Sequence, residues 1–505
     1  MPPRTSKRQR AFGAPSEADS LSVQRDAPSS AASSTRPVPV TTVPSLATLC
    51  ARKFAANFVS LRNNEPLWEH LSMQLHTVPD TIIPKIFSML RSKCPTYLKH
   101  EIIVTYLLRG PVITLTDALP GVNKKTISDI SRINAGVREL EISGFVKIAD
   151  TSFASVLGNL KSLQVLVLRG CTNVGVNAIA AVAQSCPDLK VINLNYTSAN
   201  PTSVAQLVNS CTRLECLKVA GIRNWTDATF TKFLEVVGQG NKLANLRTLK
   251  VRETQLGDAS ISALTNLCPN LQRLDASFTS LTRAASLLSP DHIQPLEKLS
   301  LTSTSISPLE LAQILPLFPQ LRVLYLGALG ISRGSQASIL NTSAMTMDGA
   351  GLKAITNALV NSVHLEQVNL VGNSKLGTTT RSDSALADFL GRVGRKCKML
   401  NMAGIPNLRS TDLAGLLPES VRDDSPAIET FILNNTGIDD EAGVYISACD
   451  HLQTLAVAGT RITRDGLFPI LDACEGLHNL DLTSCRGIGV IERRRFFDIW
   501  QEQKE

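Results

Sequence analysis

The chain has 505 residues, of which 43% are hydrophobic, 19% are charged and 5% are aromatic, and its net charge is +8. This apolar content is ample for a large core, and the mild positive charge does not demand a nucleic-acid partner. No run of about 18 apolar residues occurs, so no membrane-spanning segment is predicted. The eleven cysteines include no Cys-x-x-Cys pair, and the histidines are scattered, so we expect no structural zinc site.

Residues 1–44 are rich in Pro, Ser, Ala, Thr and Arg and show little periodicity, so we expect a disordered basic tail. Within it, Lys7-Arg8-Gln9-Arg10 and Arg4 form a short basic cluster. This cluster is either a nuclear import signal or a solvated tail. The expected location is therefore the nucleus and/or the cytoplasm.

Residues 45–130 are predicted to form a helical head. Ser45 is a predicted N-cap, and Leu46 and Cys50 lie one turn apart on one face of the helix that follows. A short apolar ridge of this kind can dock in a groove of a partner protein. The apolar stripe of this helix consists of Leu46, Leu49, Cys50, Phe54, Phe58 and Leu61.

This helix resembles the elongin-binding box of ubiquitin-ligase substrate receptors, Ser/Thr/Pro-Leu-x-x-x-Cys-x-x-x-aliphatic. Ser45, Leu46 and Cys50 match that pattern, and Phe54 stands where the family usually has an aliphatic residue. The resemblance implies that Leu46 and Cys50 contact elongin C.

Residues 78–90 resemble the cullin-contacting box that follows an elongin box, with Val78, Pro79, Ile82 and Ile86 at its motif positions. They also resemble the start of an F-box, although its Val-Cys-x-x-Trp run is not evident in residues 91–120. A third interpretation is that the head only covers the first repeat of an array. Under the first two interpretations these four residues contact the ligase, through a cullin or a Skp-type adaptor.

Residues 131–486 carry a repeated Leu-x-x-Leu-x-Leu motif, for example Leu163-Gln-Val-Leu166-Val-Leu168. Most steps between copies are 24–26 residues long and four are longer, against a typical leucine-rich repeat of roughly 20–29 residues. The thirteen copies begin at Val137, Leu163, Leu189, Leu214, Leu246, Leu271, Leu296, Leu321, Leu365, Cys397, Ile428, Leu452 and Leu477.

Each copy predicts a short strand, a turn and a helix. Alternation of the leucines indicates a strand that points both of them inward, and Ile179, Val182 and Ala183 then recur at helical spacing until Cys186-Pro187. Stacked copies would form an α/β leucine-rich repeat solenoid, a curved horseshoe with parallel strands on the concave side and helices on the convex side.

Cysteines recur at fixed places in these copies, which is typical of buried positions in a reducing compartment. The array resembles the cysteine-containing leucine-rich repeats of many F-box proteins and of ribonuclease-inhibitor-like folds. The cysteines that carry this resemblance are Cys171, Cys186, Cys211, Cys268, Cys449, Cys474 and Cys485.

The predicted concave face is basic in its first half and near neutral in its second half, where Asn369, Asn401 and Asn434 stand. We expect an acidic or phosphorylated protein segment to bind the basic half, unless it is only a solvated stripe. The candidate substrate-binding residues are Arg169, Lys218, Lys250, Arg252, Arg273 and Lys298, with Asp275 as an acidic interruption.

Three insertions, at residues 332–346, 375–381 and 418–426, are expected at a rim of the array as ligand contacts or tolerated loops. Residues 487–505 are predicted to form a C-terminal capping helix, with Phe496, Phe497 and Trp500 over the last repeat.

No motif for a catalytic nucleophile, phosphate loop or zinc protease is present, so we expect no enzyme activity, no catalytic or metal-binding residues and no cofactor. Head and array together resemble elongin-linked leucine-rich substrate receptors of cullin-RING ubiquitin ligases, including the Zyg-eleven type and the excision-repair factor of fungi. The expected protein is a monomer within such a complex. The alternatives are an F-box-like receptor of a Skp-cullin ligase, a free-standing scaffold, or a DNA-damage recognition subunit.

Overall fold

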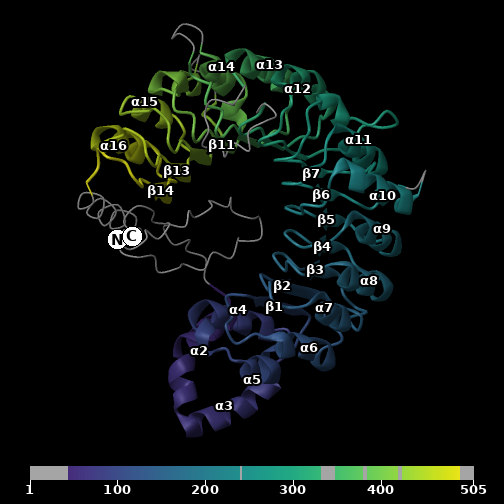
Figure 1. Cartoon of the computed structure of the whole chain (residues 1–505). Coiled ribbons are helices and arrows are strands. Elements are labelled where there is room, and N and C mark those ends of the chain that lie inside the picture. Colours follow the sequence, from purple (N-terminus) through teal and green to yellow (C-terminus); the bar gives the residue numbers. More distant parts are fainter. Residues whose placement is uncertain (1–43, 239–241, 331–346, 379–383, 419–423, 490–505) are drawn as a thin grey trace, which may run out of the picture.

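The computed structural model describes residues 44–238, 242–330, 347–378, 384–418 and 424–489 (Figure 1). In these residues fourteen parallel strands form one sheet in chain order, without a crossover. The strands are β1 (Val112–Thr116), β2 (Glu139–Ser143), β3 (Val165–Val167), β4 (Val191–Asn193), β5 (Cys216–Lys218), β6 (Thr248–Lys250), β7 (Arg273–Asp275), β8 (Lys298–Ser300), β9 (Val323–Tyr325), β10 (Gln367–Asn369), β11 (Met399–Asn401), β12 (Thr430–Ile432), β13 (Thr454–Ala456) and β14 (Asn479–Asp481).

The thirteen motif copies supply β2 to β14, which confirms the predicted leucine-rich repeat solenoid. In β3 the central Leu166 is buried, whereas Val165 and Val167 on the other face are half-buried. β1 precedes the first copy and pairs with β2, so the sheet extends one strand into the segment predicted as a head.

The sheet curves into an arch whose outer side is covered by helices, and the helical head lies at its N-terminal end (Figure 1). α8 buries Ala178, Ile179 and Val182 and ends at Ser185 with Cys186 as its C-cap, next to the predicted end. The array helices are α6 (Lys124–Ile133), α7 (Asp150–Leu157), α8 (Val176–Ser185), α9 (Pro201–Ser210), α10 (Asp227–Val237), α11 (Asp258–Leu267), α12 (Pro308–Ile314), α13 (Gly349–Leu359), α14 (Ala385–Arg392), α15 (Ala442–Ile446) and α16 (Arg464–Ala473), with 3-10 helices η3 (Ala284–Leu287), η4 (Leu315–Leu317), η6 (Gly394–Lys396) and η7 (Ser410–Leu416).

The head contains α2 (Leu46–Asn63), α3 (Glu65–Thr77), α4 (Ile83–Lys93), α5 (His100–Ile102), the 3-10 turn η1 (Pro95–Tyr97) and the π-helical turn η2 (Ile103–Leu107). Its core is continuous with the core of the array, because Phe58, Ile83 and Leu90 belong to the same buried cluster as Leu166. No helix of the described residues is long and apolar enough to cross a bilayer.

All eleven cysteines lie in the described ranges as free thiols. Cys186 Sγ lies 3.3 Å from the carbonyl oxygen of Leu160, Cys211 Sγ lies 3.3 Å from that of Cys186, and each contact joins one repeat to the repeat before it. Burial raises the pKa of the Cys186 thiol to about 12, so it stays protonated at neutral pH and can donate this hydrogen bond.

The residue seven places after the start of each motif copy has a positive φ in all thirteen copies. Glycine stands there in six copies, as at Gly170 and Gly221. The other seven copies place a side chain in this left-handed region, at Tyr196, Glu253, Phe278, Ser303, Ala328, Asn435 and Ser484. Such a conformation costs a residue other than glycine about 1–2 kcal/mol, so these positions carry backbone strain.

Several predictions concern residues outside the described ranges. These are the basic tail to residue 43, the insertion at 332–346, the middle of the tract at 418–426, and the capping helix from residue 490. The insertion at 375–381 is described as far as Thr378, and there Leu376 is buried.

Candidate protein-binding surfaces

The inner face of the sheet presents two parallel rows of side chains, because outer residues of neighbouring strands lie in register. One row runs Cys216–Thr248–Arg273–Lys298 across β5 to β8. The other runs Lys218–Lys250–Asp275–Ser300 across the same four strands. The register therefore puts Lys218 beside Lys250, and Arg273 beside Lys298.

These rows surround a hollow of about 140 Å³, which we call the basic hollow. It is lined by four cationic residues, Lys218, Lys250, Arg273 and Lys298, together with Cys216, Thr248, Leu249, Leu274 and Asp275. Burial raises the pKa of the Cys216 thiol, while Lys218, Lys250 and Arg273 act to lower it, as expected for cations close to its sulfur. Four predicted substrate-binding residues thus converge on one place.

The other two predicted residues, Arg169 and Arg252, lie outside this hollow, beside Tyr196. The Tyr196 hydroxyl donates to Glu253 Oε2 at 3.0 Å, and Arg252 Nε donates to Glu253 Oε1 at 2.9 Å. Burial and Glu253 raise the pKa of Tyr196, against the opposing charges of Arg252 and Arg169. The Arg252 guanidinium also lies over the Phe278 ring, 4.7 Å from its centroid, so this rim is held by contacts within the chain.

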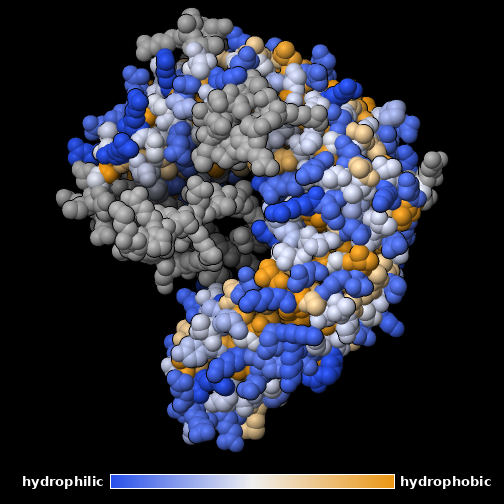
Figure 2. All heavy atoms as spheres, in the orientation of Figure 1, coloured by the Kyte–Doolittle hydropathy of each residue, from blue (hydrophilic) through white to orange (hydrophobic). Residues whose placement is uncertain are grey.

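The positive charge on the inner face is more localised than the sequence suggested. Glu139 and Glu141 stand on β2, and Val165, Val167 and Val191 form a half-buried apolar strip on β3 and β4. Figure 2 shows hydrophobic residues on the inner side of the ring near the head and hydrophilic residues further along the arch. The cations that line the basic hollow come from β5 to β8.

The asparagines of the second half have a structural role. The side-chain oxygens of Asn369 and Asn401 accept the backbone N–H groups of Val371 and Ala403, at 2.9 and 3.0 Å. Asn434 Oδ1 accepts the N–H of Ala458 in the next repeat at 2.7 Å. These contacts satisfy backbone donors where each strand turns away from the sheet.

The first head helix, α2, has two different apolar faces. Ala51, Ala55 and Phe58 are buried against the rest of the head. Leu46 and Leu49 are 77% and 44% exposed, and Cys50 is exposed as well. Ser45 caps the helix, as predicted, by accepting the N–H of Thr48.

The second predicted box lies at the junction of α3 and α4. Pro79 is exposed, whereas Val78 and Ile82 are half-buried against the core. Ile86 is buried with Phe87 and Leu90 in the head, so its side chain does not reach a partner in this structure. Burial gives Ile86 a packing role in the head, and its predicted ligase contact stays a prediction.

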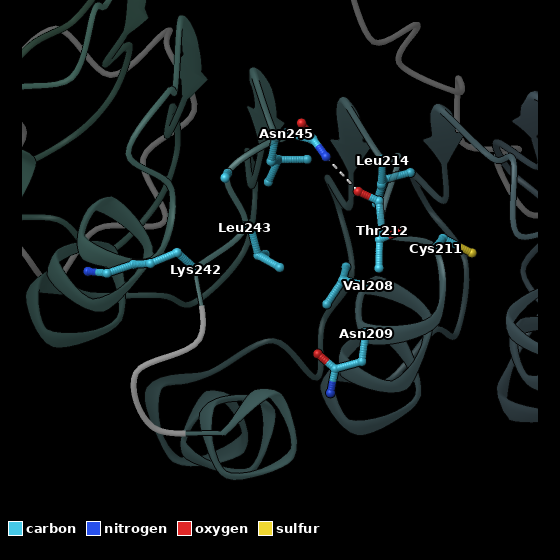
Figure 3. A pocket seen from close by; sticks show the side chains of 10 residues that line it. Val208, Asn209, Cys211, Thr212, Leu214, Lys242, Leu243 and Asn245 are labelled. Atoms are coloured by element: carbon cyan, nitrogen blue, oxygen red, sulfur yellow. Dashed lines mark hydrogen bonds between the residues drawn. The ribbon is translucent and has the colours of Figure 1, made fainter.

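A larger hollow of about 430 Å³ lies between the fourth and fifth repeats, where the step is 32 residues long (Figure 3). Its walls are joined by Asn245, whose Nδ2 donates to the Thr212 carbonyl at 2.8 Å. Lys242 Nζ, at its edge, donates to the Asn266 carbonyl at 2.8 Å. The only signal for this hollow in the sequence is the longer step, and its lining brings no group of charges together.

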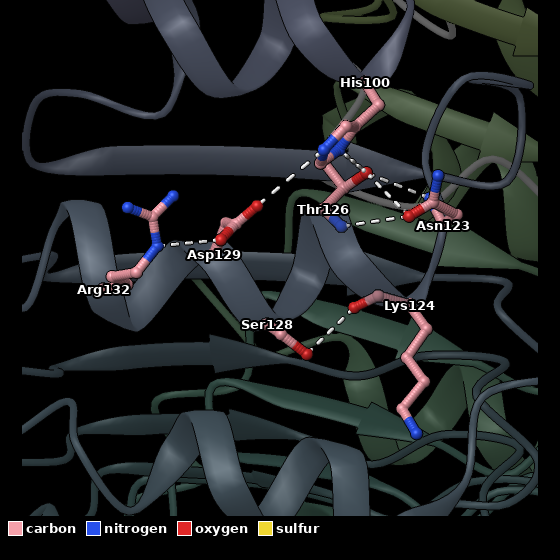
Figure 4. Close-up of polar contacts among 7 residues, drawn as sticks. All are labelled: His100, Asn123, Lys124, Thr126, Ser128, Asp129 and Arg132. Carbon is pink, nitrogen blue, oxygen red and sulfur yellow. Dashed lines mark hydrogen bonds and ion pairs between the residues drawn. The ribbon is translucent and has the colours of Figure 1, made fainter.

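The junction between head and array contains a polar cluster around His100 (Figure 4). His100 Nδ1 lies 2.9 Å from Thr126 Oγ1, and its Nε2 lies 3.9 Å from Asp129 Oδ2. These residue types also serve in nucleophilic catalysis, but Thr126 is fully buried and its Oγ1 accepts the N–H of Asn123 as part of a capping box. The cluster joins α5 to α6.

No group of His, Cys, Asp and Glu side chains in the described ranges is arranged to hold a metal ion. The fold and its two surfaces define a leucine-rich repeat solenoid with a helical head, a class of protein that acts by binding other macromolecules over a long curved face.

No family model matches the chain. It is similar to a chain of the yeast Rad7 and Elc1 complex, at 14% identity over 78% of this chain and 94% of that one, with a TM-score of 0.41. It is also similar to an internalin of Listeria monocytogenes, at 17% identity over 72% of this chain and 89% of that one (TM-score 0.39). A third similar structure is a leucine-rich repeat protein of Leptospira interrogans, at 15% identity over 80% and 95% (TM-score 0.38).

Proposed function

We propose that this protein is a non-catalytic substrate receptor of a cullin-RING ubiquitin ligase. In this proposal the head binds elongin C and a cullin, and the inner face of the array binds the substrate protein. The observation that carries it is the exposure of Leu46 and Cys50, the two residues that match the elongin-box pattern.

A helix that served only to cover the first repeat would turn its large apolar side chains toward that repeat. Instead α2 buries two alanines and Phe58 and leaves Leu46 and Leu49 in solvent. Leaving a leucine exposed forgoes about 1.5–3 kcal/mol of burial free energy. An exposed apolar ridge next to a matched cysteine is accounted for by a partner that covers it.

The second box supports a neighbouring contact. Pro79 is exposed at the turn between α3 and α4, with Val78 and Ile82 partly accessible beside it. The Lys85 Nζ of α4 donates to Thr48 Oγ1 of α2 at 3.0 Å, so the elongin-box helix and the second box belong to one packed unit. A partner complex could therefore contact both at once.

The proposal is tested with the full chain immobilised on beads and purified elongin C and a Skp-type adaptor offered separately. We expect elongin C to be retained by the wild type and lost in the Leu46→Ser/Cys50→Ala variant. The matched control is Leu67→Ser/Met73→Ser, which changes two exposed apolar residues of α3 instead.

Retention of the Skp-type adaptor instead of elongin C would replace the proposal with the F-box-like alternative. Retention of neither would favour a free-standing scaffold or a DNA-damage recognition subunit. Unchanged retention of elongin C by the Leu46→Ser/Cys50→Ala variant would refute the assignment of these two residues.

A further inference from the structure

We propose that the basic hollow binds one phosphorylated serine or threonine side chain of the substrate, so that substrate capture depends on phosphorylation. This inference rests on the proposed function, because it specifies what the inner face of the array recognises. Like charges are crowded together on β5 to β8.

Like charges on directly paired strand positions destabilise a sheet. The register here repeats that arrangement twice, with Lys218 beside Lys250 and Arg273 beside Lys298. The hollow between them contains one carboxylate, that of Asp275, against four cations. Lys298 Nζ also lies over the Tyr325 ring, 4.9 Å from its centroid. A bound anion would relieve the repulsion among the four cations.

A phosphate ester fits the geometry better than a run of acidic residues does. It concentrates a charge of about −1.5 to −2 and three acceptor oxygens in one compact group. The hollow is compact as well, at about 140 Å³, and each lysine offers three N–H donors and the arginine five. An acidic run would need cations spread along the arch, but Glu139 and Glu141 lie on β2 toward the head, and Val323 and Tyr325 stand on β9 beyond the hollow.

The neighbouring surface indicates the residues that flank the phosphate. Val191 pairs with Cys216 of the hollow, and Val165 pairs with Val191. These valines, with Val167, are half-buried and form the apolar strip between the hollow and β2. We therefore expect apolar residues on one side of the phosphorylated residue, lying along β3 and β4.

A nucleic acid is a less suitable ligand for the same cations. Nucleic-acid binding neutralises a series of phosphates along a strand, which requires a track of Lys and Arg. Among the described strands, Lys and Arg occupy inner-face positions only on β5 to β8, and the inner face toward the head carries Glu139 and Glu141. The charge pattern is suited to one phosphate on an otherwise uncharged segment.

The test uses the full chain and three bead-bound peptide libraries with degenerate flanks. They carry at the centre phosphoserine or phosphothreonine, the unmodified residue, or glutamate. We expect at least tenfold greater retention on the phosphorylated library than on the other two. This preference should be lost in Lys250→Gln/Arg273→Gln and kept in Lys161→Gln/Arg461→Gln, which removes the same charge at exposed sites away from the hollow.

A second measurement places the ligand. Cys216 lines the hollow, whereas Cys50 is exposed on the head, so the two thiols can be alkylated and quantified in one sample by mass spectrometry. A peptide selected from the phosphorylated library should slow alkylation of Cys216 and leave that of Cys50 unchanged. This readout does not depend on any substitution and is unaffected if a variant folds poorly.

Equal retention on the three libraries would overturn the inference, as would unchanged alkylation of Cys216. Binding of a DNA oligonucleotide that excludes the phosphorylated peptide would overturn it too, in favour of nucleic acid. The proposed function fails separately, through loss of elongin C binding. A chain that binds elongin C but shows no preference for phosphate would refute only this inference.

Discussion

The Tyr196 hydroxyl lies 3.0 Å from the carboxylate of Glu253, and both residues occupy the same left-handed position, in the third and fifth copies of the repeat. The fourth copy has Gly221 at this position, and a β-carbon there would lie 2.2 Å from the Tyr196 ring. The tyrosine therefore reaches across one repeat to the next because the intervening residue has no side chain. This contact holds Arg252 at the rim of the inner face.

Replacing Gly221 with alanine should be more destabilising than the same change at Gly170. Both have a positive φ, which costs alanine about 1–2 kcal/mol, but a β-carbon at Gly170 would be 3.4 Å from its nearest neighbour. Urea denaturation of the two variants measures the difference in unfolding free energy. Gly476→Ala is the control, because Gly476 has no positive φ and a β-carbon there would make only an ordinary contact, 3.6 Å from the Leu452 carbonyl oxygen. An equal effect at positions 221 and 476 would contradict the prediction.

Asp258 should make the free energy of unfolding depend on pH in the acidic range. Partial burial by itself raises its pKa, but hydrogen bonds from the side chains of Thr282 and Ser286 and from backbone N–H groups outweigh this, and the pKa is lowered. A carboxyl with a lowered pKa stabilises the fold above its ordinary value of 3.8, and this contribution is lost as the pH falls below it.

Asp258→Asn should therefore lower the free energy of unfolding by about 1 kcal/mol at pH 7, and the difference from wild type should shrink below pH 4. Denaturant titrations across this range measure it. Asp472→Asn, at an exposed site on α16, should give no such convergence, and a constant deficit in Asp258→Asn would exclude the carboxylate as its cause.

The two kinds of apolar residue in the head should respond differently to truncation. Leu46→Ser should leave the melting temperature nearly unchanged because Leu46 is 77% exposed. Leu90→Ala should cost about 2–5 kcal/mol because Leu90 is fully buried in the head. Thermal unfolding followed by circular dichroism distinguishes them, and a large loss in Leu46→Ser would mean that this residue packs within the chain.

Thr126→Val should weaken the junction between head and array. The substitution leaves the Asn123 N–H and His100 Nδ1 without a buried partner, at a cost of about 1–3 kcal/mol. Hydrogen exchange should become faster in α5 and α6 before it does in α8. Ser128→Ala on the exposed face of α6 is the control, and equal exchange in both variants would assign the junction to apolar packing alone.

Lys218→Gln should stabilise the protein slightly at low salt. Lys218 lies beside Lys250 in register, so its removal relieves repulsion worth about 0.2–1 kcal/mol. The gain should fall as salt screens the charges. Melting temperatures at low and high ionic strength test this, and a loss of stability at low salt would show that Asp275 already compensates for the charge.

The repeat could be predicted well because its spacing alone fixes the architecture. Each motif copy that begins between Val137 and Leu477 supplies a strand, and the helix from Val176 to Ser185 ends before Pro187 as the pattern indicates. The left-handed position was not predicted, because tyrosine, glutamate and phenylalanine carry no turn signal of their own. Glycine marks it in six of the thirteen copies, and this was the available signal.

The binding surfaces were predicted only in outline. The apolar residues of α2 form one stripe in the sequence, but the buried face is centred on Ala51, Ala55 and Phe58, since small side chains allow close packing against α4. The basic residues also form one set in the sequence. Separating Arg169 and Arg252 from the hollow requires the side-chain contacts with Tyr196, Glu253 and Phe278.

In the part of the chain that the structure describes, every strand from β1 to β14 forms backbone hydrogen bonds only with the strands beside it in sequence, so the last strands do not pair with the first. Nearest-neighbour stacking of this kind lets a shortened chain keep the structure of the repeats that remain. Proteolytic removal of the last copies would therefore spare both the elongin-box helix and the hollow on β5 to β8. Fragments that lack the C-terminal third should still compete with the intact protein for its partners.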